Sequence, residues 1–435
     1  MNARATVIGL ILLALLVAAC QPAATPTPQP AAATQPPEQP AVEEILIGAV
    51  YPLSGSLAST GVDLRQGVEL AVEIINNAYD LNLPLARSEG LPNLGGAKIR
   101  VIFGDHEGDP EKGASEAERL ITDEKVVALI GSYNSAVTAT ASQTAERYGV
   151  PFLNPESTSP TLTERGFQWF FRTTPDDKLF AENFFQFLDE VKAKGLEMAD
   201  IVIVNENTLW GSDVAKFEQM FAEQYGYKVV EHIPYERQAA DVTSEVQRIK
   251  ALGRPIVMQA SYVSDAILYM RTYKQLDVNP LALLAMDAGF IASEFIQTVG
   301  EDAEYILSRE VWSLDLAATK PIVKEVNDLY KERYGVNMNG NSARAFTGML
   351  VLADAINRAG STEPEAIRQA LLETDVPAEQ IIMPWGGVKF DPETHQNTLG
   401  RGIIVQIQNG QYRVVWPFDL ASVELVWPMP TWSER

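Results

Sequence analysis

The chain has 435 residues, 46% of them hydrophobic, and 57 acidic side chains outnumber 34 basic ones, giving a formal net charge of −23. This length allows two or three domains with a large core, and the negative charge argues against nucleic acids and anionic membrane surfaces as partners. Three histidines and one cysteine offer little for a metal site, a Ser-His-Asp triad or a disulfide framework. No Walker A motif occurs and no G-x-G-x-x-G follows a strand, so we expect neither a metal nor a cofactor.

Residues 1–19 have the layout of a secretory signal peptide: Arg4 is the only charge, an apolar run follows, and "VAAC" closes it. The apolar run is too short for a membrane-spanning helix. The closing residues resemble a bacterial lipobox, and this resemblance implies that Cys20 is lipidated after cleavage. Residues 20–43 are rich in Pro, Ala, Thr and Gln, which predicts an extended tether. We therefore expect an extracytoplasmic body, held at a membrane through Cys20.

Strand-like and helix-like segments alternate from residue 44 onward. The first run predicts strands at 45–52, 98–105, 126–131 and 150–155, and helices at 62–77, at 110–124 and in a stretch ending near 148. In the first helix Leu64, Val68 and Ile75 share one face at helical spacing. Asp109 followed by Pro110 is typical of a helix start.

After "FQWFFRTTP" (167–175) the alternation begins again. The second run predicts strands at 200–206, 228–235, 255–261, 280–287 and 304–311, and helices at 178–194, 212–225, 242–252, 263–276 and 291–299. Helices at 321–334, 343–358 and 364–373 follow, and the chain ends in the strand-like runs "GGVKFD", "GIIVQIQNG" and "QYRVVWP". Repeated strand–helix units predict parallel sheets covered by helices on both faces, and two runs predict two lobes that meet at "RTTP".

Binding sites in such sheets lie beyond the carboxyl ends of the strands. In "LIGSYNSAVTATAS" (129–142) the strand ends at Gly131, and Ser132, Tyr133 and Asn134 lead straight into a helix. Free backbone N–H groups and a partial positive charge at a helix N-terminus suit a carboxylate. The alternative is an ordinary helix cap made by Ser132, Asn134 or Ser135.

The other strand ends supply side chains of two kinds. The first lobe offers Glu156, Ser157 and Thr158 in "NPESTSPTL", and the second lobe offers Trp210, Tyr262 and Asp287. This division suits a zwitterion whose carboxylate meets the hydroxyls and helix ends, whose ammonium meets Asp287 and whose body lies between Trp210 and Tyr262. In the alternative, the two aromatic residues fill the core, Asp287 caps the next helix and Thr158 forms a turn.

Three stretches carry a resemblance to a known family: "IGAVYPLSGSLASTGVDLRQGVELAVEIINN", "LIGSYNSAVTATASQTAERYGVPFLNP" and "LTERGFQWFFRTTP". They resemble the Leu/Ile/Val-binding proteins, the type I extracytoplasmic solute-binding proteins of ABC transporters, over nearly all of 44–420. The resemblance implies an α/β fold of two lobes joined by a three-strand hinge that closes on ligand. It places lobe 1 at 44–175 plus 312–389 and lobe 2 at 176–311 plus 390–435.

The resemblance also assigns roles to single positions. Ser132 falls on the family's carboxylate-binding serine, and Thr158 on a threonine that contacts ligand through its hydroxyl and backbone. Tyr262 matches a pocket tyrosine of the second lobe, and Asp287 takes the place of the glutamate that binds the ammonium group.

Three positions depart from the branched-chain pattern. Trp210 stands where those proteins have a tyrosine, Thr60 stands near another pocket tyrosine, and Glu156 matches a position that usually offers only a backbone carbonyl. These departures predict a ligand specificity different from leucine, isoleucine and valine. Glu156 could favour a ligand with a polar, amide or basic side chain, or it could point to solvent.

The function expected from this reading is that of a monomeric, lipid-anchored receptor that carries out no chemistry. It takes an amino acid between its lobes and delivers it to the permease subunits of an ABC importer. One alternative is the same fold binding an amide, a urea or a carboxylate without an amino group. Another is a sensory or adhesive lipoprotein.

An enzyme is the alternative from a different class. It rests on the acidic stretch "GDHEGDPE" (104–111), which holds Asp105, His106, Glu107 and Asp109 and could form an acid or metal cluster. Neighbouring residues of a strand point to opposite faces, however, and Asp109 is expected to cap a helix.

Overall fold

The computed structural model describes residues 43–435. The predicted signal peptide, Cys20 and all of the predicted tether except Glu43 lie outside the described residues. Within residues 43–435 no helix is both long and apolar enough to cross a membrane. The described chain builds two large sheets, each with helices on both faces, as the repeated strand–helix pattern predicts.

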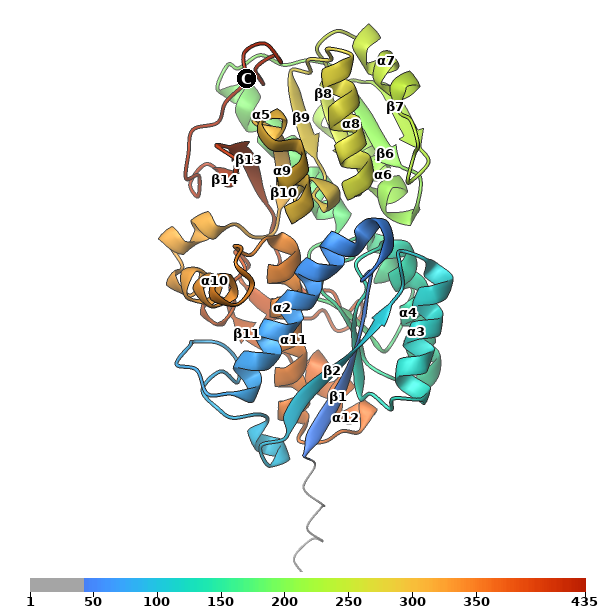
Figure 1. Ribbon diagram of the computed structural model, residues 1–435, viewed down its shortest axis with the longest axis vertical. Helices are drawn as coiled ribbons and strands as arrows, with labels where there is room; N and C mark the ends of the chain where they lie inside the picture. Colours follow the sequence, from blue (N-terminus) through green and yellow to red (C-terminus); the bar gives the residue numbers. More distant parts are fainter. Residues whose placement is uncertain (1–42) are drawn as a thin grey trace, which may run out of the picture. The chain divides into compact units, whose positions relative to one another are not determined.

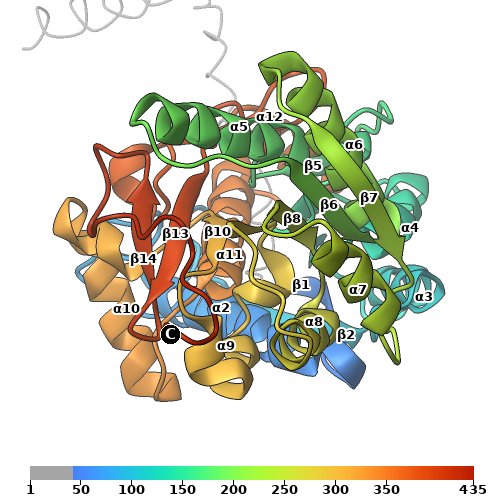
Figure 2. The ribbon, with the colours of Figure 1, turned by 90° about the horizontal axis from the view of Figure 1, so that it is seen from above.

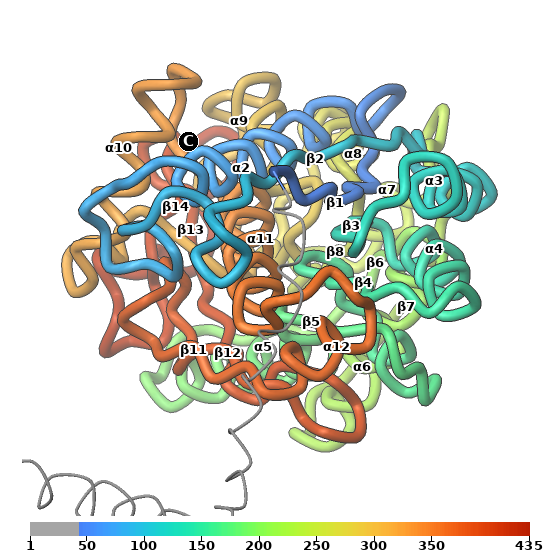
Figure 3. The backbone as a smooth tube through the Cα atoms, turned by 90° about the horizontal axis from the view of Figure 1, so that it is seen from below, coloured from blue at the N-terminus to red at the C-terminus, as the bar shows by residue number. Residues whose placement is uncertain are grey.

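The first sheet is wholly parallel, with the strand order β2-β1-β3-β4-β5. Its strands are β1 (Glu44–Tyr51), β2 (Lys98–Asp105), β3 (Ala128–Gly131), β4 (Phe152–Asn154) and β5 (Phe170–Arg172). Figure 3 shows α2 (Ala58–Asn76) and α11 (Gly340–Ala359) on one side of this sheet, and α3 (Pro110–Thr122) and α4 (Ser135–Tyr148) on the other. The predicted apolar stripe of α2, including Leu64, Val68 and Ile75, is fully buried.

The second sheet has the order β14-β13-β10-β9-β8-β6-β7. Its strands are β6 (Ile201–Glu206), β7 (Val229–Tyr235), β8 (Ile256–Ala260), β9 (Ala282–Ala285), β10 (Leu307–Glu310), β13 (Ile403–Gln408) and β14 (Gln411–Trp416). The first five are parallel, and β13 and β14 extend the sheet antiparallel. Figure 2 shows the helices of its two faces, which are α5 (Asp177–Ala193) and α6 (Leu209–Tyr225) on one, and α7 (Thr243–Ala251), α8 (Val263–Gln275) and α9 (Ser293–Val299) on the other.

Two short strands differ from the sequence expectations. No strand is expected between 155 and 200, where the two runs meet at "RTTP" (172–175), but residues 170–172 form β5, which pairs with β4. The run "GGVKFD" contains β12 (Gly387–Lys389), which pairs with the unexpected strand β11 (Asp375–Pro377) in a separate two-stranded sheet. The strands β5 and β11 have three residues each and carry too little alternation of their own to be predicted, whereas the equally short β4 lies within the apolar run 150–155. The helices α10 (Pro321–Tyr334) and α12 (Pro364–Leu372) lie close to their expected bounds.

The residue bounds of the two lobes stay a prediction, and one segment bears on the boundary at residue 390. Arg172 of β5 pairs with Gln396, and the Arg172 amide donates to the carbonyl of His395 at 3.0 Å. The His395 ring also stacks on Phe171, with ring centroids 4.4 Å apart. Residues 395–396 therefore pack on the edge of the first sheet, although the prediction assigns them to lobe 2.

Candidate functional site

A small cavity of about 20 Å³ lies where the carboxyl ends of both sheets deliver side chains. Its lining consists of Tyr133, Glu156, Thr158, Trp210, Tyr262, Asp287, Ala288, Arg309 and Arg344. The first three follow strands of the first sheet, and Arg344 lies on α11 beside that sheet. Trp210, Tyr262, Asp287, Ala288 and Arg309 come from the second sheet and its connections. This volume has room for about one water molecule. The two sides of the cavity approach closely, since the ring centroids of Tyr133 and Tyr262 lie 5.9 Å apart.

Six of the nine predicted ligand residues line this cavity: Tyr133, Glu156, Thr158, Trp210, Tyr262 and Asp287. Ser132, Ser157 and Thr60 are buried but are not part of the lining. The sequence reasoning missed Arg309 and Arg344, the two cations of the site. The available signal was an arginine inside an apolar strand and another inside an apolar helix face, in "ILSREVW" and "NSARAF".

The loop between β3 and α4 does not form the side-chain cap that was the alternative reading. Asn134 stands at the cap position of α4 but makes no side-chain cap, and its amide atoms are unpartnered within residues 43–435. The Ser132 hydroxyl is also buried without a partner there, and the Ser135 hydroxyl accepts from the Ser159 amide instead. The carboxylate-binding role of Ser132 stays a prediction.

Ser157 serves the loops behind the cavity. Its hydroxyl donates to the carbonyl of Tyr133 at 2.9 Å and lies 2.6 Å from the hydroxyl of Thr138. These bonds fix the loop after β4 against the loop after β3 and hold Tyr133 in place. Thr60 lies in the first turn of α2, where it is fully buried. A direct ligand contact by either residue stays a prediction.

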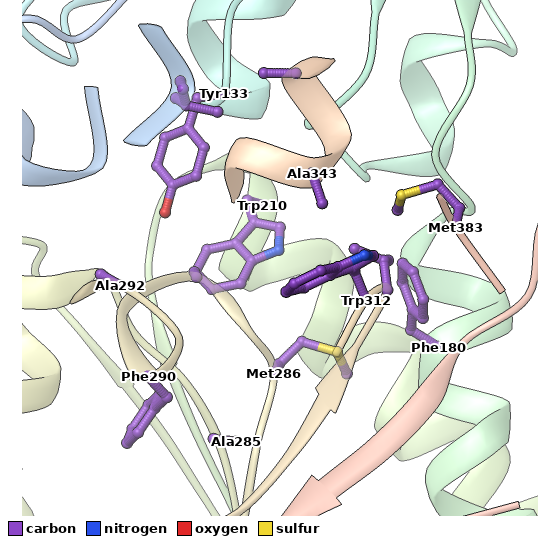
Figure 4. Packing of buried hydrophobic residues seen from close by; sticks show 14 of the residues in the cluster. Tyr133, Phe180, Trp210, Ala285, Met286, Phe290, Ala292, Trp312, Ala343 and Met383 are labelled. Carbon is purple, nitrogen blue, oxygen red and sulfur yellow. The ribbon is translucent and has the colours of Figure 1, made fainter. Parts of the chain in front are cut away.

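Three aromatic rings form the apolar wall of the cavity. The ring centroids of Trp210 and Tyr262 lie 4.9 Å apart, and those of Tyr133 and Tyr262 lie 5.9 Å apart. Figure 4 shows the Tyr133 ring directed toward the side on which Trp210 lies, within the packed core. Tilted ring pairs at these distances are favourable, and they present flat apolar faces to a solute. Trp210 and Tyr262 therefore line the cavity and at the same time belong to the hydrophobic core, so each of the two hypotheses for these residues describes part of their environment.

The charged part of the lining is a buried ion cluster centred on Asp287. One oxygen, Oδ2, accepts from Nη1 of Arg309 and, at 3.0 Å, from Nη1 of Arg344. The other oxygen, Oδ1, accepts from the Ala288 amide at 2.6 Å, so Asp287 caps the short helix Ala288–Phe290 and not the predicted next helix, whose cap position is Ala292. All three charged side chains are at most 2% exposed. The predicted ammonium acceptor thus already has two cationic partners.

Glu156 is a buried acid at the edge of this cluster. Its Oε1 accepts from the Tyr51 hydroxyl at 2.9 Å, and its Oε2 has no partner within residues 43–435. Burial raises the pKa of Glu156 to about 8, although the charge of Arg344 acts in the opposite direction. At neutral pH this side chain is therefore mostly protonated and faces the cavity side as a neutral acid. It does not point to solvent, since it is 3% exposed.

The raised pKa of Glu156 predicts a pH dependence of stability. The folded protein holds this proton where the unfolded chain has lost it, so the free energy of unfolding falls as pH rises from about 4.5 to about 8. We expect Glu156→Gln to remove a slope of roughly 1 kcal/mol per pH unit between pH 6 and pH 7. Urea unfolding of both proteins at several pH values measures this slope. If the free energy of unfolding changed with pH by the same slope in both proteins, the raised pKa of Glu156 would be contradicted.

The acidic stretch 104–111 performs structural tasks. Asp105 accepts from the amides of Leu53 and Glu107, and Asp109 caps α3 through the amides of Glu111 and Lys112, as predicted. His106 is buried and burial lowers its pKa to about 4. Its Nδ1 accepts from the Gly108 amide, so Nε2 carries the proton and donates to the carbonyl of Ser132 at 2.8 Å. Within residues 43–435 no group of three or more His, Cys, Asp or Glu side chains is placed to hold a metal ion.

A larger cavity of about 300 Å³ lies beside Trp312, Leu314, Met338 and Tyr412. It collects side chains from α9, from the segments after β10 and before α11, and from β14. None of the predicted ligand residues lines it. The small cavity is the better candidate, because it unites the carboxyl ends of both sheets, convergent charges and aromatic rings.

The two sheets, their flanking helices and a cavity between their carboxyl ends define a solute-binding protein of the two-lobed α/β class. The chain belongs to the periplasmic binding protein family, whose model matches residues 44–411. This finding confirms the family resemblance and the fold class expected from the sequence.

Three proteins illustrate the relationship. Leu/Ile/Val-binding protein homolog 7 of Brucella abortus (strain 2308) is 30% identical over 405 residues, which cover 91% of this chain and 97% of that protein. The structure of the leucine-binding protein LivK from Thermotoga maritima matches with a TM-score of 0.73 and 22% identity, over 86% of this chain and 99% of that one. A solute-binding protein of an ABC transporter from R. palustris, in complex with benzoate, matches with a TM-score of 0.72 and 17% identity, over 86% and 95%.

Proposed function

We propose that this chain is the extracytoplasmic receptor of an ABC importer. It holds a small solute of the amino-acid type, or a related carboxylate, between its two lobes. The observation that supports this most is the cavity that Tyr133, Glu156 and Thr158 share with Trp210, Tyr262 and Asp287. Convergent polar groups and aromatic walls at the strand ends are typical of solute sites in α/β proteins. The names of the relatives support the same class, since one is a homolog of Leu/Ile/Val-binding protein, one is a leucine-binding protein and one was solved in complex with benzoate.

The receptor works by a shift between open and closed states and carries out no chemistry. A solute that contacts both walls stabilises the closed arrangement, and this arrangement presents the surface that a permease binds. A contact between segments assigned to different lobes, away from the cavity lining, is already present in this structure. The Ser293 hydroxyl lies 3.0 Å from Asp63 of α2, and Asn339 donates to Asp63 at 2.7 Å. The carboxylate of Asp63 therefore links the start of α9 to the start of α11 across α2.

A screen for stabilising solutes tests the proposed function. The panel holds the twenty amino acids, amides, urea, polyamines and short carboxylates, and the measurement is the thermal unfolding of the purified protein. A ligand at a hundred times its dissociation constant adds roughly 2.7 kcal/mol of apparent stability, which is readily detected. Stabilisation by one or a few carboxylate-bearing solutes is the expected result. A flat response across the whole panel would contradict the function.

Membrane attachment through Cys20 is part of the proposal. The cell-produced protein is expected to enter the detergent-rich phase when its extract is partitioned with a phase-separating detergent, because a lipidated cysteine carries acyl chains. Cys20→Ser removes the attachment point and is expected to move the protein to the aqueous phase or to stop its processing. Equal partitioning of both proteins into the aqueous phase would show that Cys20 carries no lipid.

A further inference from the structure

The charges that line the cavity do not balance, and the imbalance bears on which solute the proposed receptor takes. Two guanidinium groups, those of Arg309 and Arg344, share the carboxylate of Asp287, and Nη2 of Arg309 also lies 4.0 Å from Oδ1 of Asp177. Glu156, the other acid of the lining, is mostly protonated because burial raises its pKa to about 8. Two further acids, Asp177 and Glu310, do not line the cavity, and burial raises their pKa values to about 7 and about 8. The lining therefore carries an excess of positive charge.

An ammonium group would find no free charged acceptor in this lining. Both oxygens of Asp287 are engaged, one by the two arginines and the other by the Ala288 amide. One oxygen of Glu156 accepts from Tyr51, and its acid is neutral. A buried ammonium group in such surroundings would lie close to two guanidinium groups without a carboxylate of its own, which is costly.

A carboxylate would find the opposite situation. The Nε–H of Arg344 is buried and has no partner within residues 43–435, while Nη1 and Nη2 of the same group are held by Asp287 and Asn341. These two bonds fix the guanidinium plane, so that a fixed, charged donor remains for an anion. The buried Oε2 of Glu156 is likewise without a partner. When Glu156 is protonated, this second group can also donate to a carboxylate oxygen.

We propose that the solute is a carboxylate without an ammonium group, which Arg344 anchors while its flat apolar body lies against Trp210, Tyr262 and Tyr133. Asp287 acts as a positioning residue that orients both arginines. This inference rests on the proposed function and assigns the substrate class of the same site. The overall charge of −23 does not oppose it, because charges farther than about 10 Å from the anion are largely screened at 0.1 M salt.

Matched sets of compounds test the inference with the unaltered protein. One set shares an aromatic body: 3-phenylpropanoate, phenylalanine, 2-phenylethylamine and 3-phenylpropanamide. A second set shares an aliphatic body: 4-methylpentanoate, leucine, 3-methylbutylamine and 4-methylpentanamide. Isothermal titration calorimetry at neutral pH measures each dissociation constant. Within a set the compounds differ only in their charged or polar groups, so their affinities report the charge preference of the cavity.

The expected result is that a carboxylate binds at least roughly tenfold more tightly than its parent amino acid, a difference of about 1.4 kcal/mol, and that the amine and amide do not bind. Tighter binding of phenylalanine or leucine than of its deaminated partner would overturn the inference and leave the proposed function standing. Binding of none of the eight compounds, together with a flat response in the wider screen, would contradict both.

Substitution of Arg344 gives a second, independent readout. Arg344→Gln is expected to weaken carboxylate binding by roughly a hundredfold, in the range for loss of one partner of a buried charged contact. Arg344→Lys keeps the charge and is expected to retain part of the affinity. Arg65→Gln, at an arginine of α2 whose side chain is 51% exposed, is the matched control. If Arg344 instead occupied the place of a ligand ammonium, Arg344→Gln would free Asp287 and tighten amino-acid binding, which would overturn the inference.

Discussion

The variant Asp287→Asn is expected to lose about 3–5 kcal/mol of its free energy of unfolding, the range for breaking a buried ion cluster by removing one partner. Asp287 is 1% exposed, and it is the acid that both Arg309 and Arg344 contact in the cavity lining. Without its charge, two buried guanidinium groups repel each other, and only Arg309 keeps an acid nearby, Asp177 at 4.0 Å. Asparagine is the suitable replacement, because residue 287 has a φ of 56° and asparagine tolerates positive φ better than alanine does.

Urea unfolding measures this loss, and Asp328→Asn serves as its matched control. Asp328 pairs with Lys324 on α10, where the two side chains are 56% and 68% exposed, so its replacement is expected to cost less than about 1 kcal/mol. The double variant Asp287→Asn/Arg344→Gln is expected to recover part of the stability, since one unpaired charge is removed. A loss for Asp287→Asn no larger than that of the control would show that the arginines do not depend on this carboxylate.

The second large effect is expected at Gly67, where α2 crosses α11. A Cβ atom at this position would lie 2.2 Å from the carbonyl oxygen of Ser342 and 3.0 Å from its Cα. Both obstacles are backbone atoms in the first turn of α11, and they cannot rotate away. Gly67→Ala therefore forces the two helices apart, at a cost of about 1–3 kcal/mol. In an exposed helix the same substitution would instead stabilise by up to about 1 kcal/mol, so the sign of the change is informative.

Gly386→Ala is the control for this helix crossing. A Cβ atom there would meet its nearest neighbour, the Leu399 Cβ, at 3.7 Å, which is an ordinary contact. We expect urea unfolding to show little change for Gly386→Ala and a clear loss for Gly67→Ala. Equal stabilities of the two variants would contradict the close approach of α2 to α11.

The sequence predicts the order of the elements well, because each long helix and strand carries its own periodicity. The apolar stripe of α2 and the cap at Asp109 are local signals that the structure confirms. The strands β5 and β11 are too short to carry such a signal, and only pairing with β4 and β12 reveals them. The pairing of strands within each sheet therefore identifies short strands that the local sequence pattern does not.

For the site, the rule that ligands bind at strand ends finds Tyr133, Glu156, Thr158, Trp210, Tyr262 and Asp287. It cannot find Arg344, which lies on a helix more than fifty residues after Asp287 and reaches the cavity only through the packing of α11 on the first sheet. It also cannot tell that Ser157 turns toward Thr138. The apolar surroundings of Arg309 and Arg344 in the sequence are the only local sign of their burial, and nothing local identifies Asp287 as their partner.

A crystal structure of the protein with the tightest-binding solute from the screen tests the central claim most directly. The account predicts electron density for that solute between Trp210 and Tyr262, with its carboxylate within hydrogen-bond distance of Arg344. Density in the larger cavity beside Trp312 and Tyr412, or a solute whose ammonium group displaces Arg344 from Asp287, would contradict it.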